Sequence, residues 1–152
     1  MSDRPQTQAI RMLLVEDNEA DVYLLRQALK AAGLVAELIV IADGAAAMSF
    51  VRDGAVPDMA VLDLNLPKHG GLDILEAIRD RSDWSKVPIA VMSSSMSPTE
   101  QARTAELGAR RYIRKPPDLE PFLRIGQTLK EMLEESKQAS NAFTHDFKCD
   151  AV

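Results

Sequence analysis

The sequence has few of the features that crosslink a protein, anchor it in a membrane or bind it to nucleic acid. Its single cysteine, Cys149, excludes an intrachain disulfide and a thiolate metal cluster, and it fits a reducing cytoplasm. No apolar run approaches the ~18 residues of a membrane span, and the polar first residues are unlike a signal peptide. Lys and Arg number 18 against 23 Asp and Glu, a net charge of −5 that argues against nucleic-acid binding. We therefore expect a cytoplasmic protein that binds neither membranes nor nucleic acids.

The 152 residues suffice for one globular domain, and short apolar runs alternate along them with longer amphipathic ones. Short runs rich in Val, Ile and Leu are typical of strands that are buried on both faces. Strands are expected at residues 12–15, 38–41, 59–62, 88–92 and, more weakly, 112–113. Helices are expected at residues 22–29, 45–51, 72–78, 98–107 and 118–136.

This alternation predicts an α/β fold of three layers, in which helices cover both faces of a parallel sheet. Right-handed crossovers and five strands favour the flavodoxin-like order 2-1-3-4-5, numbered along the chain. We expect residues 10–136 to form this domain, between an N-terminal tail at 1–9 and a C-terminal extension at 137–152.

Polar residues follow four of the predicted strands, at the edge of the sheet where such folds bind ligands. Glu16 and Asp17 follow the first strand, Asp63 the third, Ser93 the fourth and Lys115 the fifth. Three clustered carboxylates usually hold a cation, and an oxygen-only ligand set favours Mg²⁺ or Mn²⁺. A lysine and a hydroxyl beside that cation can hold the oxygens of a phosphoryl group. The pattern therefore predicts a site that accepts or transfers phosphate.

Each of these residues has an ordinary structural explanation when it is taken alone. Glu16 or Asp17 alone is more often the cap of the next helix, and Ser93 is more often a loop serine. Lys115 alone is most simply a surface lysine. Together, however, the structural explanation needs a coincidence at four separate strand ends, so we favour a shared site.

Four segments carry a resemblance to a known family: residues 13–18 (LLVEDN), 62–67 (LDLNLP), 88–93 (PIAVMS) and 112–116 (YIRKP). In order and spacing they resemble the receiver domain of two-component response regulators, from about residue 10 to residue 136. Each segment alone is weakly specific, whereas all four in register are highly specific. The long final helix and the segment 62–68 are also similar to small regulators that are paired with bacterial phytochrome kinases.

The resemblance implies that Asp63 is the phosphoacceptor for a sensor histidine kinase. Asp17 and Asp63 would bind Mg²⁺ (or Mn²⁺) directly, Glu16 through a water molecule, and Asn65 through its backbone carbonyl. The domain would not be an enzyme beyond its own phosphorylation and dephosphorylation.

The family pattern also implies a conformational switch. Ser93 would move toward the phosphoryl group, Lys115 would pair with it, and Tyr112 would follow Ser93 inward. The surface of the helix at 98–107, the strand at 112–113 and the final helix would then contact a downstream protein. The family further implies a cis Lys115–Pro116 bond. The Gly70–Gly71 pair departs from the common pattern, and we expect it to loosen the loop before the third helix.

Two other functions share parts of this pattern. A haloacid-dehalogenase-like phosphatase also uses an aspartyl nucleophile with Mg²⁺, but it needs a second acid two residues later, where this chain has Asn65. A flavodoxin-like flavin protein needs a Ser/Thr-rich phosphate loop after the first strand, where this chain has acids.

The charges of the last strand and the last helix suit a homodimer. Bases surround the strand at 112–113 and acids end the final helix: Arg110, Arg111, Arg114, Glu131, Glu134 and Glu135. The extension adds an apolar pair, Phe143 and Phe147, four residues apart. Two interpretations stay open, a symmetric contact between two copies and a frayed terminus.

Overall fold

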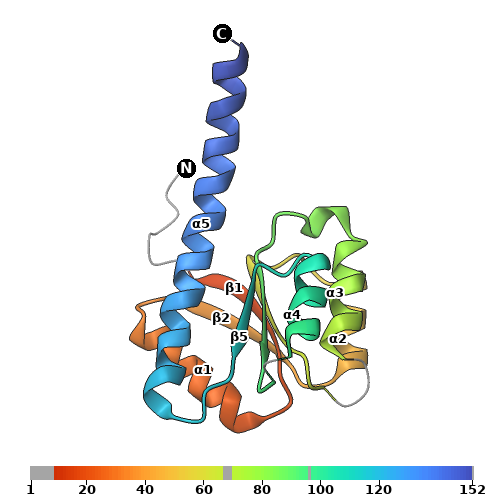
Figure 1. Cartoon of the computed structure of the whole chain (residues 1–152), viewed down its shortest axis with the longest axis vertical. Coiled ribbons are helices and arrows are strands. Elements are labelled where there is room, and N and C mark those ends of the chain that lie inside the picture. The colour runs from red at the N-terminus through yellow and green to blue at the C-terminus, as the bar shows by residue number, and fades with distance from the viewer. Residues whose placement is uncertain (1–8, 67–69, 96, 152) are drawn as a thin grey trace.

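Five parallel strands form one sheet in the order β2-β1-β3-β4-β5, with helices on both of its faces (Figure 1). The computed structural model describes residues 9–66, 70–95 and 97–151. The strands are β1 (Ile10–Val15), β2 (Ala36–Ile41), β3 (Met59–Asp63), β4 (Ile89–Ser93) and β5 (Arg111–Arg114). The predicted fold and strand order are therefore confirmed, and each strand lies where an apolar run predicted it.

Five α-helices and a short 3₁₀ helix accompany the strands in the described residues; all but the last helix connect one strand to the next. They are α1 (Glu19–Ala31), α2 (Gly44–Asp53), α3 (Gly71–Arg79), η1 (Ser82–Trp84), α4 (Pro98–Glu106) and α5 (Leu119–Ala151). Helices α1 and α5 cover one face of the sheet, and α2, α3 and α4 cover the other (Figure 1). Side-chain caps fix where several helices begin: Asn18 caps α1, and Ser97 caps α4 with Pro98 at its first position.

The core has two halves because alternate residues of each strand face opposite sides of the sheet. In β1, Leu13 and Val15 pack toward α2 and α3, whereas Met12 and Leu14 pack toward α1 and α5. All four side chains are buried, which accounts for a strand that is apolar without alternation.

Helices α1 and α5 are in close contact at Gly126. A Cβ atom at this position would lie 2.0 Å from the carbonyl oxygen of Ala28, so no larger residue fits without moving the helices apart. This contact holds α1 beside α5, and it therefore helps to fix the start of α1 at the edge of the sheet.

Helix α5 is longer than the sequence pattern predicted. Its backbone stays helical to Ala151, whereas we expected the helix to end near residue 136. Residues 137–151 contain neither glycine nor proline, so nothing in this segment interrupts the helix. The side chains of Phe143 and Phe147 lie outside the part that the structure describes.

None of the helices within the described residues combines the length and the hydropathy that a bilayer crossing requires.

Candidate functional site

Three carboxylates meet at the carboxyl ends of β1 and β3. Glu16 and Asp17 directly follow β1, and Asp63 is the last residue of β3. One carboxylate oxygen of each lies within 4.8 Å of the others. Glu16 and Asp63 are each 3% exposed, whereas Asp17 is exposed. The predicted cluster is therefore present, with two buried acids and one at the surface.

The Lys115 ammonium lies among these acids. It follows β5, and its Nζ is 2.9 Å from Glu16 Oε1 and 3.2 Å from Asp63 Oδ2. The same Nζ donates a hydrogen bond of 2.9 Å to Asp21 Oδ2 in the first turn of α1. Asp21 was not predicted as a site residue, because an acid in a first turn is already explained by the helix dipole.

Burial and charge set the protonation of the cluster. Burial raises the pKa of Glu16 to about 7, and a hydrogen bond to Asp63 acts in the same direction against the opposing effect of Lys115. Burial by itself would lower the pKa of Lys115, but its hydrogen bonds to Glu16 and Asp21 outweigh this effect and raise it. Lys115 therefore stays protonated and positively charged, and the Glu16 carboxyl is partly protonated near neutral pH.

The expected cis bond before Pro116 is wrong: the Lys115–Pro116 peptide bond is trans. The trans form is favoured for bonds to proline by roughly 0.5–1 kcal/mol. With a trans bond the Lys115 ammonium already reaches both Glu16 and Asp63, so the ion pairs of the site do not need the other isomer.

The backbone after β3 supports Asp63. The amide N–H of Asn65 donates a hydrogen bond of 2.9 Å to Asp63 Oδ1, so the backbone holds one oxygen of this carboxylate in place. Gly71, the first residue of α3, lies so close that a Cβ atom would meet the Leu64 Cα at 2.9 Å and the Asp63 carbonyl at 3.0 Å. Here glycine allows α3 to begin close to Asp63, which is a packing role for Gly71; the expected loosening of the loop stays a prediction, because residues 67–69 lie outside the described residues.

Ser93 and Tyr112 converge on a residue that the sequence analysis did not select, Glu100 of α4. The fully buried Ser93 hydroxyl donates to Glu100 Oε1 at 3.2 Å and accepts the Ser95 N–H at 3.0 Å. The Tyr112 hydroxyl lies 2.6 Å from the same Glu100 oxygen and 2.9 Å from the Ser95 carbonyl oxygen. Burial and the Glu100 contact raise the pKa of the Tyr112 phenol.

The donor set fits a hard divalent cation. It offers carboxylate oxygens without any sulfur or imidazole, which Mg²⁺ and Mn²⁺ prefer. The buried Glu16, with its raised pKa, is a group that a nearby positive charge would stabilise in its ionised form. An acid at the end of β3, a lysine beside it and a nearby hydroxyl together match the chemistry of phosphoryl transfer to a carboxylate.

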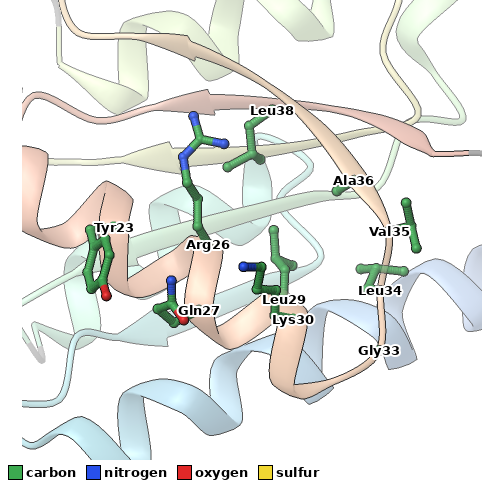
Figure 2. A pocket seen from close by; sticks show the side chains of 10 residues that line it. All are labelled: Tyr23, Arg26, Gln27, Leu29, Lys30, Gly33, Leu34, Val35, Ala36 and Leu38. Atoms are coloured by element: carbon green, nitrogen blue, oxygen red, sulfur yellow. The ribbon is translucent and has the colours of Figure 1, made fainter.

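A hollow of about 620 Å³ lies between α1 and β2, at the edge of the sheet. In Figure 2, Arg26 extends from α1 toward Leu38 of β2. The residues that line this hollow are Tyr23, Arg26, Gln27, Leu29, Lys30, Gly33, Leu34, Val35, Ala36 and Leu38. A smaller hollow of about 330 Å³ shares Tyr23 and Arg26 with it and is lined by Glu16 and Asp17. The surface is therefore indented from the carboxylates along α1 to the turn at Gly33.

Comparison with known proteins connects this geometry to a family. The model of the response regulator receiver domain matches residues 12–125. Response regulator Rcp1 of Synechocystis sp. is 32% identical over 136 residues, which cover 86% of this chain and 92% of Rcp1. The polar-differentiation response regulator DivK of Brucella anthropi is 27% identical over 122 residues, 80% of this chain and 94% of DivK.

Two solved structures show the same fold at similar identity. The phosphorylated cyanobacterial phytochrome response regulator RcpA is similar with a TM-score of 0.75 and 30% identity, over 83% of this chain and 94% of RcpA. The Mn²⁺-bound form of Rcp1 is similar with a TM-score of 0.72 and 31% identity, over 80% of this chain and 91% of Rcp1.

Proposed function

The chain belongs to the response regulator receiver domain family and acts as a phosphoacceptor in two-component signalling, and we propose that Asp63 is the residue that takes the phosphoryl group. The observation that carries this proposal is the position of Asp63. It ends β3, is almost completely buried, and has its two carboxylate oxygens held by the Asn65 amide and the Lys115 ammonium. Glu16 has similar contacts, with the Asn18 amide and the Lys115 ammonium, but it lies one residue beyond β1, whereas Asp63 is itself the last residue of a strand.

In the proposed reaction, a carboxylate oxygen of Asp63 attacks the phosphorus of a phosphohistidine on a sensor kinase. The O–P bond forms as the P–N bond to the kinase imidazole breaks, and the product is an acyl phosphate. Glu16, Asp17, Asp63 and the Asn65 carbonyl would hold a divalent cation, which would supply positive charge near the phosphoryl oxygens when bound. Mg²⁺ is our specific proposal for this cation, with Mn²⁺ as a substitute.

Lys115 and Ser93 serve the phosphoryl group from the other side. The Lys115 ammonium already lies beside Asp63, and it pairs with a phosphoryl oxygen once the acyl phosphate exists. The Ser93 hydroxyl turns toward the phosphoryl group, and Tyr112 acts as the aromatic part of the switch. Because β5 carries Tyr112, the change reaches the surface formed by α4, β5 and α5, which contacts the downstream protein.

Response regulator receivers work with histidine kinases and downstream targets in general. For this chain we further propose a cytoplasmic location and no catalysis beyond its own phosphorylation and dephosphorylation. A homodimer is also proposed, although two of its predicted charges already pair with each other within one chain. Arg111 forms an ion pair of 3.2 Å with Glu135 of the same chain. Contacts between copies would therefore depend more on the exposed Arg110 and Arg114.

Incubation with acetyl phosphate and Mg²⁺ tests the proposal. Mass spectrometry should show an added mass of about 80 Da, the mass of one phosphoryl group, on the wild-type chain and none on Asp63→Asn. Asp73→Asn is the matched control, since it removes an exposed acid from the first turn of α3, and it should label like the wild type. Equal labelling of Asp63→Asn and the wild type would refute the assignment of Asp63.

A further inference from the structure

One oxygen of Glu100 accepts hydrogen bonds from both proposed switch residues. The hydroxyls of Ser93 and Tyr112 reach Glu100 Oε1 from β4 and β5, at 3.2 Å and 2.6 Å. Glu100 itself lies in the first turn of α4 and is only half-buried. This one carboxylate therefore connects the ends of two strands to the helix that packs beside them.

The sequence around Glu100 suggests a different role for this side chain. Ser97 and Glu100 have the spacing of a capping box, in which the glutamate accepts the N–H of the capping serine. Only half of this box is present: the Ser97 hydroxyl accepts the Glu100 N–H at 3.3 Å. The Ser97 N–H instead donates to the Ser95 hydroxyl at 3.1 Å. The Glu100 carboxylate therefore does not take part in the helix cap, and it accepts hydrogen bonds from Ser93 and Tyr112 instead.

We propose that Glu100 is a positioning residue that retains the Ser93 hydroxyl in the unphosphorylated protein, so that a phosphoryl group on Asp63 must compete with it. The proposal rests on the proposed function of Asp63 and Ser93. A serine hydroxyl has one proton, and a carboxylate can only accept. The Ser93 proton can therefore form a full hydrogen bond either to Glu100 or to a phosphoryl oxygen, but not to both at once.

Tyr112 responds differently to the same carboxylate. Its hydroxyl has a second acceptor, the Ser95 carbonyl oxygen at 2.9 Å, so it keeps a partner if Glu100 is changed. The Ser93 hydroxyl donates to Glu100 at 3.2 Å, and besides Glu100 only the Tyr112 phenol is described as a further hydrogen-bond partner for its proton. A change at Glu100 should therefore affect Ser93 first, and its effect should depend on the presence of the Ser93 hydroxyl.

Beryllofluoride, a phosphoryl analogue, tests the competition when it is titrated onto the Mg²⁺-loaded protein and followed by ¹⁹F NMR. Glu100→Gln should bind it roughly threefold to tenfold more tightly than the wild type, because a neutral acceptor holds the Ser93 proton less strongly than a carboxylate. Glu106→Gln is the matched control: it removes an exposed acid from the other end of α4 and should leave the affinity unchanged.

Combination with Ser93→Ala separates competition for a proton from simple charge removal. In the Ser93→Ala background, Glu100→Gln should no longer increase the affinity, whereas an effect of charge alone would persist. A second variant, Glu100→Ala, should tighten binding at least as much as Glu100→Gln, and thermal unfolding of the apo variants checks that both are folded.

Two results would overturn the inference. One is an unchanged or weaker affinity in folded Glu100→Gln and Glu100→Ala, and the other is the same gain with and without the Ser93 hydroxyl. A wild-type protein that binds no beryllofluoride would instead overturn the proposed phosphorylation site, and the role of Glu100 with it.

Discussion

Binding of a divalent cation to the three-carboxylate cluster should depend strongly on pH between 6 and 8. The cause is Glu16, whose burial raises its pKa to about 7 in the protein without a cation. A carboxylic acid whose pKa is raised holds its proton at pH 6 and loses it by pH 8. A cation needs the ionised oxygens, so binding at the lower pH must displace this proton.

The size of the effect follows from the pKa. With a pKa of about 7, the apparent Kd increases by a factor of 1 + 10^(7−pH), which is about 11 at pH 6 and about 1.1 at pH 8. Mg²⁺ should therefore bind about tenfold more weakly at pH 6 than at pH 8. Binding should also release about 0.9 protons at pH 6 and about 0.1 at pH 8.

Isothermal titration calorimetry in two buffers of different ionisation enthalpy measures both quantities. Glu16→Gln should flatten the dependence of the Kd on pH and abolish most of the proton release. Glu19→Gln is the matched control, because Glu19 is an exposed acid three residues away and should leave the dependence intact. A wild-type Kd that changes less than twofold between pH 6 and pH 8 would refute the reasoning.

The proton on Glu16 also affects the stability of the protein without a cation. The folded pKa is raised above the usual value of 4.5, so the folded state holds the proton more tightly than the unfolded state does. The resulting stabilisation is fully present below about pH 4.5 and is lost as the pH rises through 7. The loss is at most about 3 kcal/mol, and chemical denaturation at pH 5.5 and pH 8 in the presence of a chelator should show its direction.

Three further predictions concern other parts of the molecule. Without Mg²⁺, Asp63→Asn should unfold at a higher temperature than the wild type, because one of three crowded carboxylates is removed; its free energy of unfolding should be greater by on the order of 1 kcal/mol. A clear loss of stability would mean that Asp63 is a structural cap. Lys115→Ala should bind Mg²⁺ as well as the wild type or better and should lose its output, yet it should be destabilised by up to about 3 kcal/mol when no cation is present, because the buried carboxylates lose their ammonium. Calorimetric unfolding with and without Mg²⁺ checks this, and equal destabilisation in both conditions would contradict it. The full chain should sediment as a dimer. A dimer that depends on Arg110 and Arg114 should weaken in high salt, whereas one that depends on residues 137–152 should be lost in a chain ending at residue 136; a monomer throughout, phosphorylated or not, would exclude the proposed homodimer.

The main part of the site could be predicted because parallel strands end at the same edge of their sheet. Val15 of β1 lies beside Leu62 of β3, so Glu16 and Asp63, the next residues, lie close together. Ser93 of β4 pairs with Arg114 of β5, which places Lys115 one residue beyond the same edge. Each position follows from the end of an apolar run, which is visible in the sequence.

The rest could not be predicted because it depends on how helices are placed against the sheet. Asp21 and Glu100 lie in the first turns of α1 and α4, where helix capping and the helix dipole already explain an acid. A sequence pattern gives the period of a helix but not its rotation relative to a strand end. The contacts of Asp21 with Lys115 and of Glu100 with Ser93 depend on that rotation.

These two acids have a common physical role in the absence of a phosphoryl group. A buried lysine or hydroxyl that serves a phosphoryl oxygen must have another partner while that oxygen is absent, because an unsatisfied buried donor is costly. Lys115 is satisfied in part by Asp21, and Ser93 is satisfied by Glu100. In each case the substitute acceptor comes from the first turn of the helix that follows a strand of the site. The strength of these substitute contacts, together with the phosphoryl group itself, therefore determines how readily the domain leaves its unphosphorylated state.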